Sequence, residues 1–255
     1  ESTATLPEHM NIYPLEPRSD TLRGDPPRWY GLGFDRFTDL LEERGAQVIQ
    51  LNHPRQGCNY LCLIGYDRET GEPDPTLNTL NFGYDEGELW GWGFNAVELL
   101  NDPRPIFMSL DQPESTGFYE DWASFINLGH PATGMGVSDV HGPDGIGVPV
   151  TLLKLTEGDV VAKVTETSPD MVGEAVVQGR AQVSLGAWIE LDVNGADLGE
   201  LALPTLSEMA THTFDLAMTV RAVPSVDVSW VYLFVNCDLA YSWEAQAPFE
   251  VIKHE

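Results

Sequence analysis

Basic residues are scarce in this sequence. Of its 255 residues, 13 are Lys or Arg and 40 are Asp or Glu, which leaves a formal net charge of -27. Only three lysines occur, Lys154, Lys163 and Lys253. No basic run is present that could neutralise phosphates, so nucleic-acid binding is not expected. The acidic excess favours solubility and suits a salty or extracellular setting, but it does not identify a substrate.

Long apolar runs are also missing. No stretch of about 18 apolar residues occurs, so no membrane span is expected. The opening residues, ESTATLPEHM, have neither the positive nor the apolar region of a signal peptide. The sequence also lacks an initiator methionine. We therefore expect position 1 to be a cut end and the gene product to begin further upstream.

Cysteine is rare as well. The three cysteines, Cys58, Cys62 and Cys237, are too few for a disulfide framework. Cys58 and Cys62 are close enough to pair across a short loop in an oxidising compartment, and the alternative is three free thiols. A nucleophilic pair of Cys58 with His53 would need an electropositive setting, which this acidic chain does not offer. We expect a secreted or periplasmic protein, with a cytoplasmic one as the alternative.

The first half of the chain alternates helical and strand-like patterns. With 42% hydrophobic residues the chain can bury a core. Residues 33–44 have apolar side chains at helical spacing before Gly45, and residues 118–128 repeat this pattern before Gly129. Short apolar runs at 46–52 and 94–100 read as strands. This alternation predicts an α/β fold with a parallel sheet or barrel.

The second half changes character. Residues 169–179 form one last predicted helix, with Pro169 in its first turn and Gly179 at its end. Polar and apolar residues then alternate in the runs AQVSLGAWIELDV, THTFDLAMTVRAV, VSWVYLFVNCD and PFEVIKH. Period-two alternation without intervening helices predicts an antiparallel β-sandwich. We expect a domain boundary near residue 180, with one domain over 1–180 and a second over 181–255.

Polar residues at predicted strand ends are the strongest functional signal. Asp139 and His141 lie two residues apart in SDVH, so an extended backbone directs both side chains to one side. His53 and Glu98 end two other predicted strands, and His9 stands next to a fourth. The carboxyl ends of parallel strands face one crevice, where imidazoles and carboxylates suit a divalent metal. The alternative is that each histidine merely caps a strand.

Several of these strings resemble a known family. EHMNIYPL, QVIQLNHPR, FNAVELLN and NLGHPATGMGVSDVHG are similar to the later motifs of the polymerase-and-histidinol-phosphatase (PHP) superfamily, in its carbaryl-hydrolase branch (CehA/McbA-type). QGRAQVSLGAWIELDVNGADLGE is similar to the connection that follows the barrel in that branch. The resemblance implies the C-terminal part of a distorted (β/α)7 PHP barrel followed by an antiparallel β-sandwich. It also implies hydrolysis assisted by one to three Zn, Mn or Fe ions.

The resemblance assigns metal ligands position by position. His9, His53, Asp139 and His141 match the family's ligands, and Glu1 matches an acidic ligand that precedes them. The sequence departs from the pattern beside His9, where Glu8 replaces a usual glycine and a methionine replaces a usual aromatic residue.

Two further residues have expected roles next to the metal. Glu98 lies in a motif typical of the branch, and we interpret it as supporting the ligands or the structure rather than ligating the metal. Arg55 is expected either to contact an anionic group of the substrate or to bridge to a neighbouring carboxylate. The catalytic group itself would be a metal-activated water.

The opening motifs of the family are not in this sequence. Family members begin their barrel with an HxH motif and an Asp-His element, and this chain would hold only the last strands. An open half-barrel exposes strand edges and apolar faces, which soluble proteins avoid. We therefore expect an N-terminal segment to come from the same precursor after proteolytic processing, or from a partner subunit.

Two functions follow as hypotheses. The first is a metal-dependent hydrolase that cleaves an ester, amide, carbamate or phosphoester bond in a small-molecule substrate. The second is a non-catalytic structural or binding protein on a degenerate PHP scaffold, whose acidic sandwich mediates assembly, including a homo-oligomer. The tryptophans and the tyrosines near them could line a glycan groove, but core packing is the commoner reason for them. These tryptophans are Trp90, Trp92, Trp188, Trp230 and Trp243.

Overall fold

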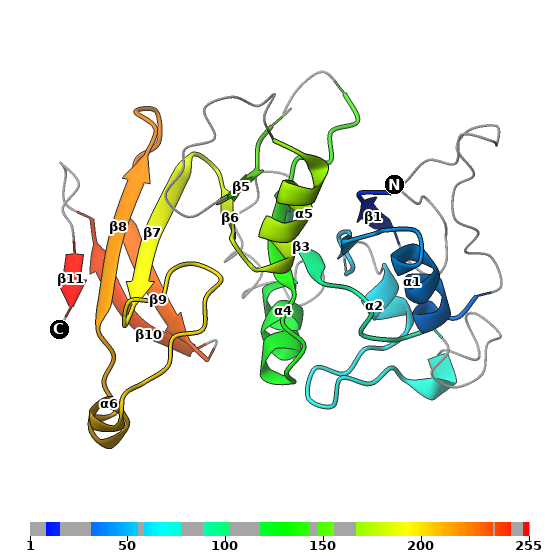
Figure 1. The fold of residues 1–255 in the computed structure, drawn as a ribbon, viewed down its shortest axis with the longest axis horizontal. Coiled ribbons are helices and arrows are strands. Elements are labelled where there is room, and N and C mark those ends of the chain that lie inside the picture. Colours follow the sequence, from blue (N-terminus) through cyan, green and yellow to red (C-terminus); the bar gives the residue numbers. More distant parts are fainter. Residues whose placement is uncertain are drawn as a thin grey trace.

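The computed structural model describes residues 9–15, 32–55, 59–77, 89–101, 118–142, 147–155, 167–236, 238–245 and 252–254. The molecule is elongated (Figure 1): the N-terminal strands and helices α1 and α2 lie at one end, and strands β7 to β11 lie at the other. Helices α4 and α5 stand between these ends, and α6 projects from the C-terminal end.

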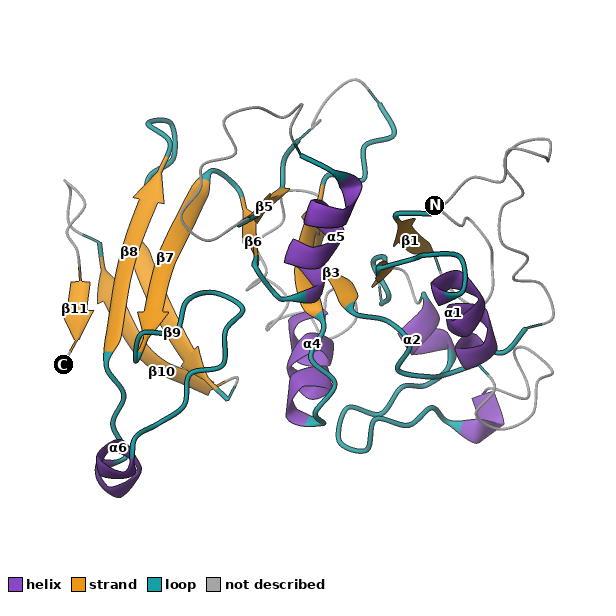
Figure 2. Ribbon diagram, viewed as in Figure 1, coloured by secondary structure: helices purple, strands orange, loops and turns teal. Residues whose placement is uncertain are grey.

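The helices are α1 (Phe34–Glu42), α2 (Tyr60–Leu63), α4 (Phe118–Asn127), α5 (Pro169–Val177) and α6 (Leu206–Thr211). The strands of the N-terminal half are β1 (Met10–Tyr13), β2 (Val48–Leu51), β3 (Ala96–Asn101), β4 (Thr133–Val137) and β5 (Val150–Leu153). Those of the C-terminal half are β6 (Ala181–Ser184), β7 (Ala187–Val193), β8 (Leu216–Ala222), β9 (Trp230–Val235), β10 (Asp238–Glu244) and β11 (Ile252–His254). Figure 2 separates the helical and the strand-rich parts.

The three longest helices are those that the sequence predicted. In α1, Phe34, Phe37 and Leu41 form the buried stripe that the helical spacing indicated. Helix α5 begins at Pro169, and the Ser168 hydroxyl caps it by accepting the backbone N–H of Met171. These local signals decide helix position because the apolar spacing and the cap act within one or two turns.

The N-terminal half is built on a mixed four-stranded sheet of order β1-β2-β3-β4. Strands β2, β3 and β4 are parallel, as expected, but β1 pairs antiparallel with β2, with Met10 opposite Leu51. Within the described residues the sheet is open and does not close into a barrel. Because β1 runs the other way, its amino-terminal end lies beside the carboxyl ends of the parallel strands.

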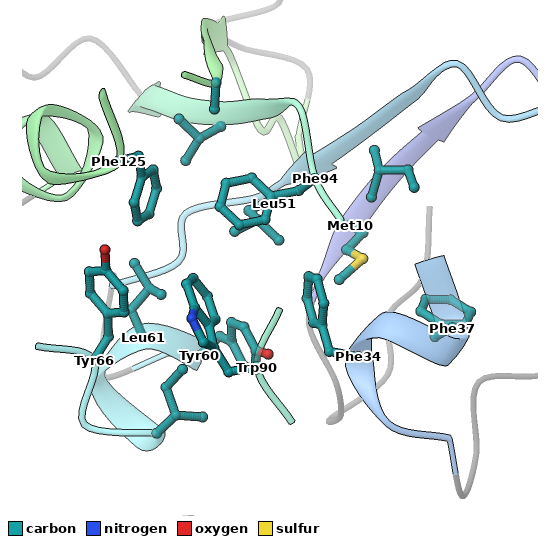
Figure 3. Close-up of a cluster of buried hydrophobic side chains, with 14 of the residues drawn as sticks. Met10, Phe34, Phe37, Leu51, Tyr60, Leu61, Tyr66, Trp90, Phe94 and Phe125 are labelled. Carbon is teal, nitrogen blue, oxygen red and sulfur yellow. The ribbon is translucent and has the colours of Figure 1, made fainter. Parts of the chain in front are cut away.

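The main core fills the space between one face of this sheet and helices α1, α2 and α4 (Figure 3). Trp90, Tyr66 and Phe125 form an aromatic group at its centre, with the Tyr66 and Trp90 ring centroids 4.9 Å apart. Burying each of these side chains contributes about 1.5–3 kcal/mol. Trp90 comes from a stretch of the chain with many polar and turn-forming residues, and the structure places its side chain in this core.

The other face of the sheet packs against α5. Val48, Ala96 and Met135 contact Val176 of this helix. Gly173 faces the Gln47 side chain: a Cβ atom at Gly173 would lie 2.2 Å from Oε1 of Gln47, so a larger residue would require that side chain to move. Helices therefore lie on both faces of this mixed sheet. The PHP-type barrel stays a prediction.

All strand pairs of the C-terminal half are antiparallel, as the period-two pattern predicted. They form a β11-β8-β7 sheet, a two-stranded β9-β10 sheet and a two-stranded β5-β6 sheet. The β5-β6 pairing crosses residue 180, and Val183 of β6 packs against the main core. The boundary near residue 180 and the complete sandwich stay predictions.

None of the helices in the described ranges is long and apolar enough to cross a membrane.

Candidate metal centre

Two of the predicted ligands occupy equivalent turns at one edge of the sheet. His53 follows the end of β2 at Leu51 by two residues, and Asp139 follows the end of β4 at Val137 by the same interval. Both have a positive φ, 30° for His53 and 41° for Asp139. Residues other than glycine rarely adopt this conformation, and strained turns of this kind concentrate at functional sites.

His9 reaches the same edge because β1 is antiparallel. Its backbone oxygen accepts the N–H of Asn52 at 2.9 Å, which extends the pairing of β1 with β2 by one step. Its Nδ1 atom lies 2.9 Å from Nε2 of His53, and the two ring centroids are 4.8 Å apart. The structure therefore brings together two of the predicted ligands from positions 44 residues apart.

The nitrogen separation suits a shared cation. Two nitrogens that each lie about 2.1 Å from one ion, at octahedral or tetrahedral angles, are roughly 3.0–3.4 Å apart. The observed 2.9 Å between His9 Nδ1 and His53 Nε2 is a hydrogen-bond distance and lies just below that range. Imidazole nitrogen is also a donor that Zn, Mn and Fe accept in proteins.

Asp139 and His141 form the second pair of predicted ligands. Nε2 of His141 lies 3.3 Å from Oδ1 of Asp139, and the His141 side chain is 84% exposed. Asn101, the last residue of β3, donates its side-chain N–H to Oδ2 of Asp139 at 3.0 Å. The two side chains lie together as the SDVH spacing suggested, but the backbone is not extended as expected, because β4 ends at Val137 and Asp139 has a φ of 41°.

Glu98 lies between the two pairs and is 1% exposed. Burial raises its pKa to about 8; hydrogen bonds from the Asn101 side chain and the His53 backbone oppose this rise, and the charge of Asp139 adds to it. Its Oε1 atom is buried without a hydrogen-bond partner among the described residues. Glu98 therefore contacts the loop of His53 and, through Asn101, Asp139.

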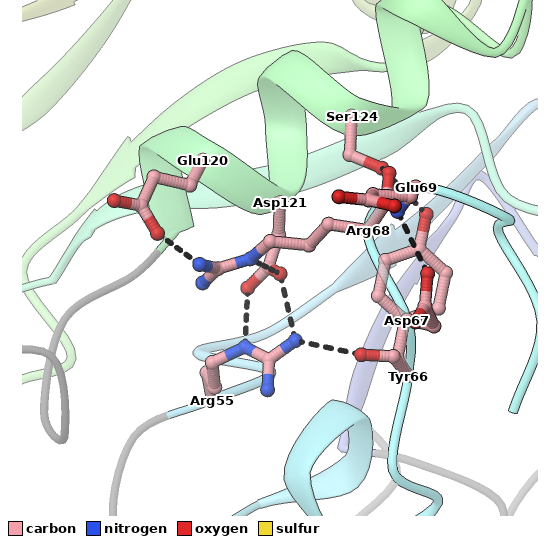
Figure 4. A network of polar contacts seen from close by, with 8 residues as sticks. All are labelled: Arg55, Tyr66, Asp67, Arg68, Glu69, Glu120, Asp121 and Ser124. Carbon is pink, nitrogen blue, oxygen red and sulfur yellow. Dashed lines mark hydrogen bonds and ion pairs between the residues drawn. The ribbon is translucent and has the colours of Figure 1, made fainter. Parts of the chain in front are cut away.

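Arg55 is held in an ion-pair network rather than extended into solvent (Figure 4). Its Nε and Nη2 atoms donate to the two carboxylate oxygens of Asp121 at 2.7 and 2.8 Å. Asp121 is fully buried in α4 and also accepts from Arg68, which in turn pairs with Glu120. This is the second of the roles expected for Arg55, a bridge to a neighbouring carboxylate, and it attaches the loop after His53 to α4.

The predicted ligands come together as two pairs rather than as one cluster. Among the residues that the structure describes, no three His, Cys, Asp or Glu side chains form a group able to hold a metal ion. Glu1 lies outside the described residues. The donor types still fit a divalent transition metal, and the unpartnered Oε1 of Glu98 adds a buried carboxylate oxygen between the pairs.

Two asparagines at the site were not predicted from the sequence. Asn59 places its side-chain nitrogen 2.8 Å from Nδ1 of His53, and Asn101 contacts Asp139. Asn101 ends a predicted strand, so the same strand-end reasoning that selected Glu98 would have found it. Asn59 carries no such signal, because it lies in an irregular loop before α2.

The other histidines and tryptophans described below lie outside the two pairs of predicted ligands. His130 stacks on Trp92 with a centroid distance of 4.0 Å, and His212 ends α6 with a φ of 56°. Trp90 and Trp92 belong to the core, as the commoner interpretation expected, whereas Trp230 is 50% exposed.

The cysteines are partly described. Cys62 is disulfide-bonded, so the alternative of three free thiols is wrong. Cys58 and Cys237 lie outside the described residues.

Comparison of this chain with protein-family models, with curated proteins and with solved structures finds no match. Function therefore has to be inferred from the side chains at the sheet edge.

Proposed function

We propose that the protein is a metal-dependent hydrolase that cleaves an ester, amide, carbamate or phosphoester bond in a small-molecule substrate. The observation that carries the proposal is the 2.9 Å approach of His9 Nδ1 to His53 Nε2. It occurs at the sheet edge that also carries Asp139 and His141. The facing ring nitrogens show that His9 and His53 contact each other, so they are not independent strand caps, and imidazole is a common metal ligand.

His9, His53, Asp139 and His141 would hold the ion, which we propose to be Zn, Mn or Fe. When bound, such an ion lowers the pKa of a water molecule and polarises the scissile carbonyl or phosphoryl group. Glu98 supports the site from beneath by accepting the backbone N–H of His53 and the Asn101 amide. Arg55 keeps the loop of His53 on α4 through Asp121.

Further ligands are part of the proposal, because each described pair supplies only two donors and a bound ion usually has three or more protein ligands. We propose that Glu1 and a companion segment, from the same precursor or a partner subunit, complete the set. Intact-mass analysis and native electrophoresis of the purified material test this. A companion polypeptide that co-migrates with the chain is expected, and a single 28.1 kDa species that retains metal would contradict it.

Secretion is also proposed. The disulfide of Cys62 supports it, since disulfides form and persist mainly in oxidising compartments. Cell fractionation with an antibody to the chain would show the protein outside the cytoplasm if this is correct.

Metal content after purification is the direct test of the hydrolase. We expect near-stoichiometric Zn, Mn or Fe in the wild-type protein and a loss of at least tenfold in His53→Asn. Asparagine tolerates the positive φ at this position, so the backbone turn is kept. His212→Asn is the matched control, because His212 also has a positive φ but lies at the end of α6. Equal metal content in both variants would contradict the proposal.

A non-catalytic binding protein is the second candidate. It is favoured by the absence of a three-member metal group in the described part and by a strongly exposed apolar segment around α6. Leu201, Leu203 and Leu206 are 81%, 71% and 86% exposed. Such a segment is typical of an interaction surface. A folded wild-type protein that contains no metal and hydrolyses no ester or phosphoester would favour this candidate.

A further inference from the structure

A cavity of about 460 Å³ is lined by residues of strands β5, β6, β7 and β8 and of the loop that follows β7. All of the lining residues belong to the described part of the chain, and none of them is a predicted metal ligand. The volume lies within the roughly 300–1,000 Å³ of small-molecule sites. The cavity is therefore a candidate binding site that the proposed hydrolase does not use.

One wall of the cavity is a face of β7. Trp188, Glu190 and Asp192 alternate along this strand, so their side chains share one face, and all three line the cavity. On the neighbouring strand β8, Thr219 pairs with Glu190, and Ala217 pairs with Asp192. Both of these residues also line the cavity. Because Ala217 has a small side chain, it leaves room beside the carboxylate of Asp192.

Trp188 is half-buried and has no polar partner. Among the described residues, its indole N–H donates no hydrogen bond and its ring contacts no other aromatic ring. By contrast, Trp90 donates to the backbone oxygen of Gly71, and Trp122 donates to that of Ala132. Tryptophans that are removed from water usually find such a partner. The ring and the N–H of Trp188 thus stay unused by the described protein groups around the cavity.

The charged side chains that line the cavity are mainly negative. Glu190, Asp192 and Asp197 supply three carboxylates, and Lys154 supplies the one ammonium group among the lining residues. Such a wall repels anions, and the net charge of -27 on the whole chain adds to this repulsion. The electrostatics of the cavity therefore favour a cationic ligand over an anionic one.

Asp192 is the carboxylate of this group that lacks a cation. Asp197 pairs with Lys154. Glu190 accepts from Nε and Nη2 of Arg221 at 2.9 and 3.2 Å. Among the described residues Asp192 forms no ion pair, and its Oδ1 atom accepts a backbone N–H at 2.9 Å. The carboxylate of Asp192 thus has room for a further charged donor.

Several of the remaining lining side chains are apolar. Leu152 and Leu153 of β5 line the cavity, as does Leu198 of the loop after β7. Leu152 is 39% exposed, which is high for a large apolar side chain beside a cavity. A ligand with an apolar body would remove this surface from water, which is favourable. A small inorganic cation would leave it exposed.

We propose that this cavity binds a small organic ammonium ion that carries an aromatic or aliphatic body. The ammonium group donates to the carboxylate of Asp192. Because Trp188 stands at the other end of the same row of side chains, the attached body extends toward its ring and covers Leu152. The site is independent of the candidate metal centre, so the inference holds or fails separately from the hydrolase.

Three probes with the same aromatic body test the charge preference: 4-phenylbutylammonium, 4-phenylbutan-1-ol and 4-phenylbutanoate. Binding to the full chain is measured by titration calorimetry at pH 7 in 100 mM NaCl. We expect one ammonium ion to bind per chain, at least tenfold more tightly than the alcohol, since hydrogen bonds to charged groups are the stronger ones. No binding of the carboxylate is expected. Equal affinity for the ammonium ion and the alcohol, or no binding of the ammonium ion, overturns the inference.

Variants then locate the site. Asp192→Asn keeps an oxygen for the backbone N–H and removes the charge, so we expect about fivefold weaker binding of the ammonium ion and unchanged binding of the alcohol. Asp227→Asn is the matched control, because Asp227 is exposed and does not line the cavity. It is expected to change the affinity for the ammonium ion less than twofold. Equal losses in the two variants would indicate general attraction to an acidic protein and overturn the inference.

Trp188→Leu tests the contact with the apolar body. We expect it to weaken binding of the ammonium ion and of the alcohol alike, by about fivefold, because both probes carry the same ring. Circular dichroism of each variant checks that the strands are kept. Should Trp188→Leu fail to fold, Asp192→Asn still decides the inference. A folded Trp188→Leu that binds both probes as tightly as the wild type overturns the site.

Discussion

At the scale of the residue, the carboxyl group of Glu98 is the most perturbed group next to the candidate site. It is buried beneath the turn of His53, and its charged form receives only two hydrogen bonds there. Its pKa of about 8 means that the folded protein keeps it protonated at neutral pH. Because this carboxyl group is neutral, the sheet edge near the two pairs of predicted ligands carries less negative charge than its acidic residues suggest.

Glu98→Gln is expected to remove a pH dependence of stability. The folded-state pKa of about 8 lies above the ordinary value of 4.5, so the folded state binds this proton more tightly. The contribution of Glu98 to the free energy of unfolding is therefore fully present below about pH 4.5 and is lost as the pH rises to about 8. Between these values the free energy of unfolding falls by up to about 1.4 kcal/mol per pH unit. Urea unfolding of chelator-treated wild type and variant at pH 5 to 9 measures the difference. A difference that is constant over this range would refute the expectation.

Asp121 is the residue on which the loop of His53 depends most. It is buried and joins Arg55 to Arg68, so Asp121→Asn leaves two guanidinium groups without their shared carboxylate. We expect a loss of about 2–3 kcal/mol in the free energy of unfolding, which is less than the roughly 3–5 kcal/mol for a fully buried pair, because both arginines are partly exposed.

Glu120 provides the matched control. It neighbours Asp121 and also pairs with Arg68, but its side chain is 45% exposed. Glu120→Gln is expected to cost less than about 1 kcal/mol. Urea unfolding of both variants measures the two losses in the free energy of unfolding. Equal losses would contradict the larger role expected for the buried carboxylate of Asp121.

At the scale of the element, helices α5 and α6 have similar caps and different surroundings. Ser168 caps α5, which packs on the sheet through Val176, whereas Thr205 forms a capping box with Glu208 in α6, which has no buried residue. A cap contributes to global stability only when the helix that it holds is part of the cooperative core.

Ser168→Ala is therefore expected to lower the free energy of unfolding by about 1 kcal/mol. Thr205→Ala, the control, is expected to increase hydrogen exchange within α6 and to change global stability by less than about 0.5 kcal/mol. Chemical unfolding and amide exchange measure both quantities. A global loss from Thr205→Ala as large as that from Ser168→Ala would show that α6 is part of the core.

The helices were predictable, but the direction of one strand was not. Helices α1, α4 and α5 agree with predictions from local spacing, because a helix buries a stripe that recurs every three to four residues. The alternation of side chains along β1 is the same whichever way the strand runs. The sequence pattern therefore could not predict that β1 pairs antiparallel with β2. The same reversal places His9 beside His53. The sequence suggested this meeting from the carboxyl ends of parallel strands and from the resemblance, but not from an antiparallel strand.

At the scale of the whole molecule, the net charge of -27 acts on every part of the structure. Like charges on the folded surface repel, and unfolding relieves this repulsion by moving them apart. Salt weakens such interactions, since the screening length falls from about 30 Å at 0.01 M to about 8 Å at 0.15 M.

We expect the midpoint of thermal unfolding to rise by several degrees between 20 and 500 mM NaCl, as measured by calorimetry. KCl serves as the control, because it screens charge equally and should give the same rise. A midpoint that falls with salt, or that rises with only one of the two, would contradict general self-repulsion.

The sequence alone determined the positions of the main helices, the antiparallel character of the second half and the pairing of Asp139 with His141. All of these depend on residues close together in the chain, whose spacing decides which side chains share a face. Tertiary structure decided the direction of β1, the meeting of His9 with His53, the burial of Glu98 and the clamp of Arg55 on Asp121. These depend on residues between 35 apart, as for Tyr13 and Val48, and 66 apart, as for Arg55 and Asp121. Such contacts arise only when the layers pack, and no local period records them.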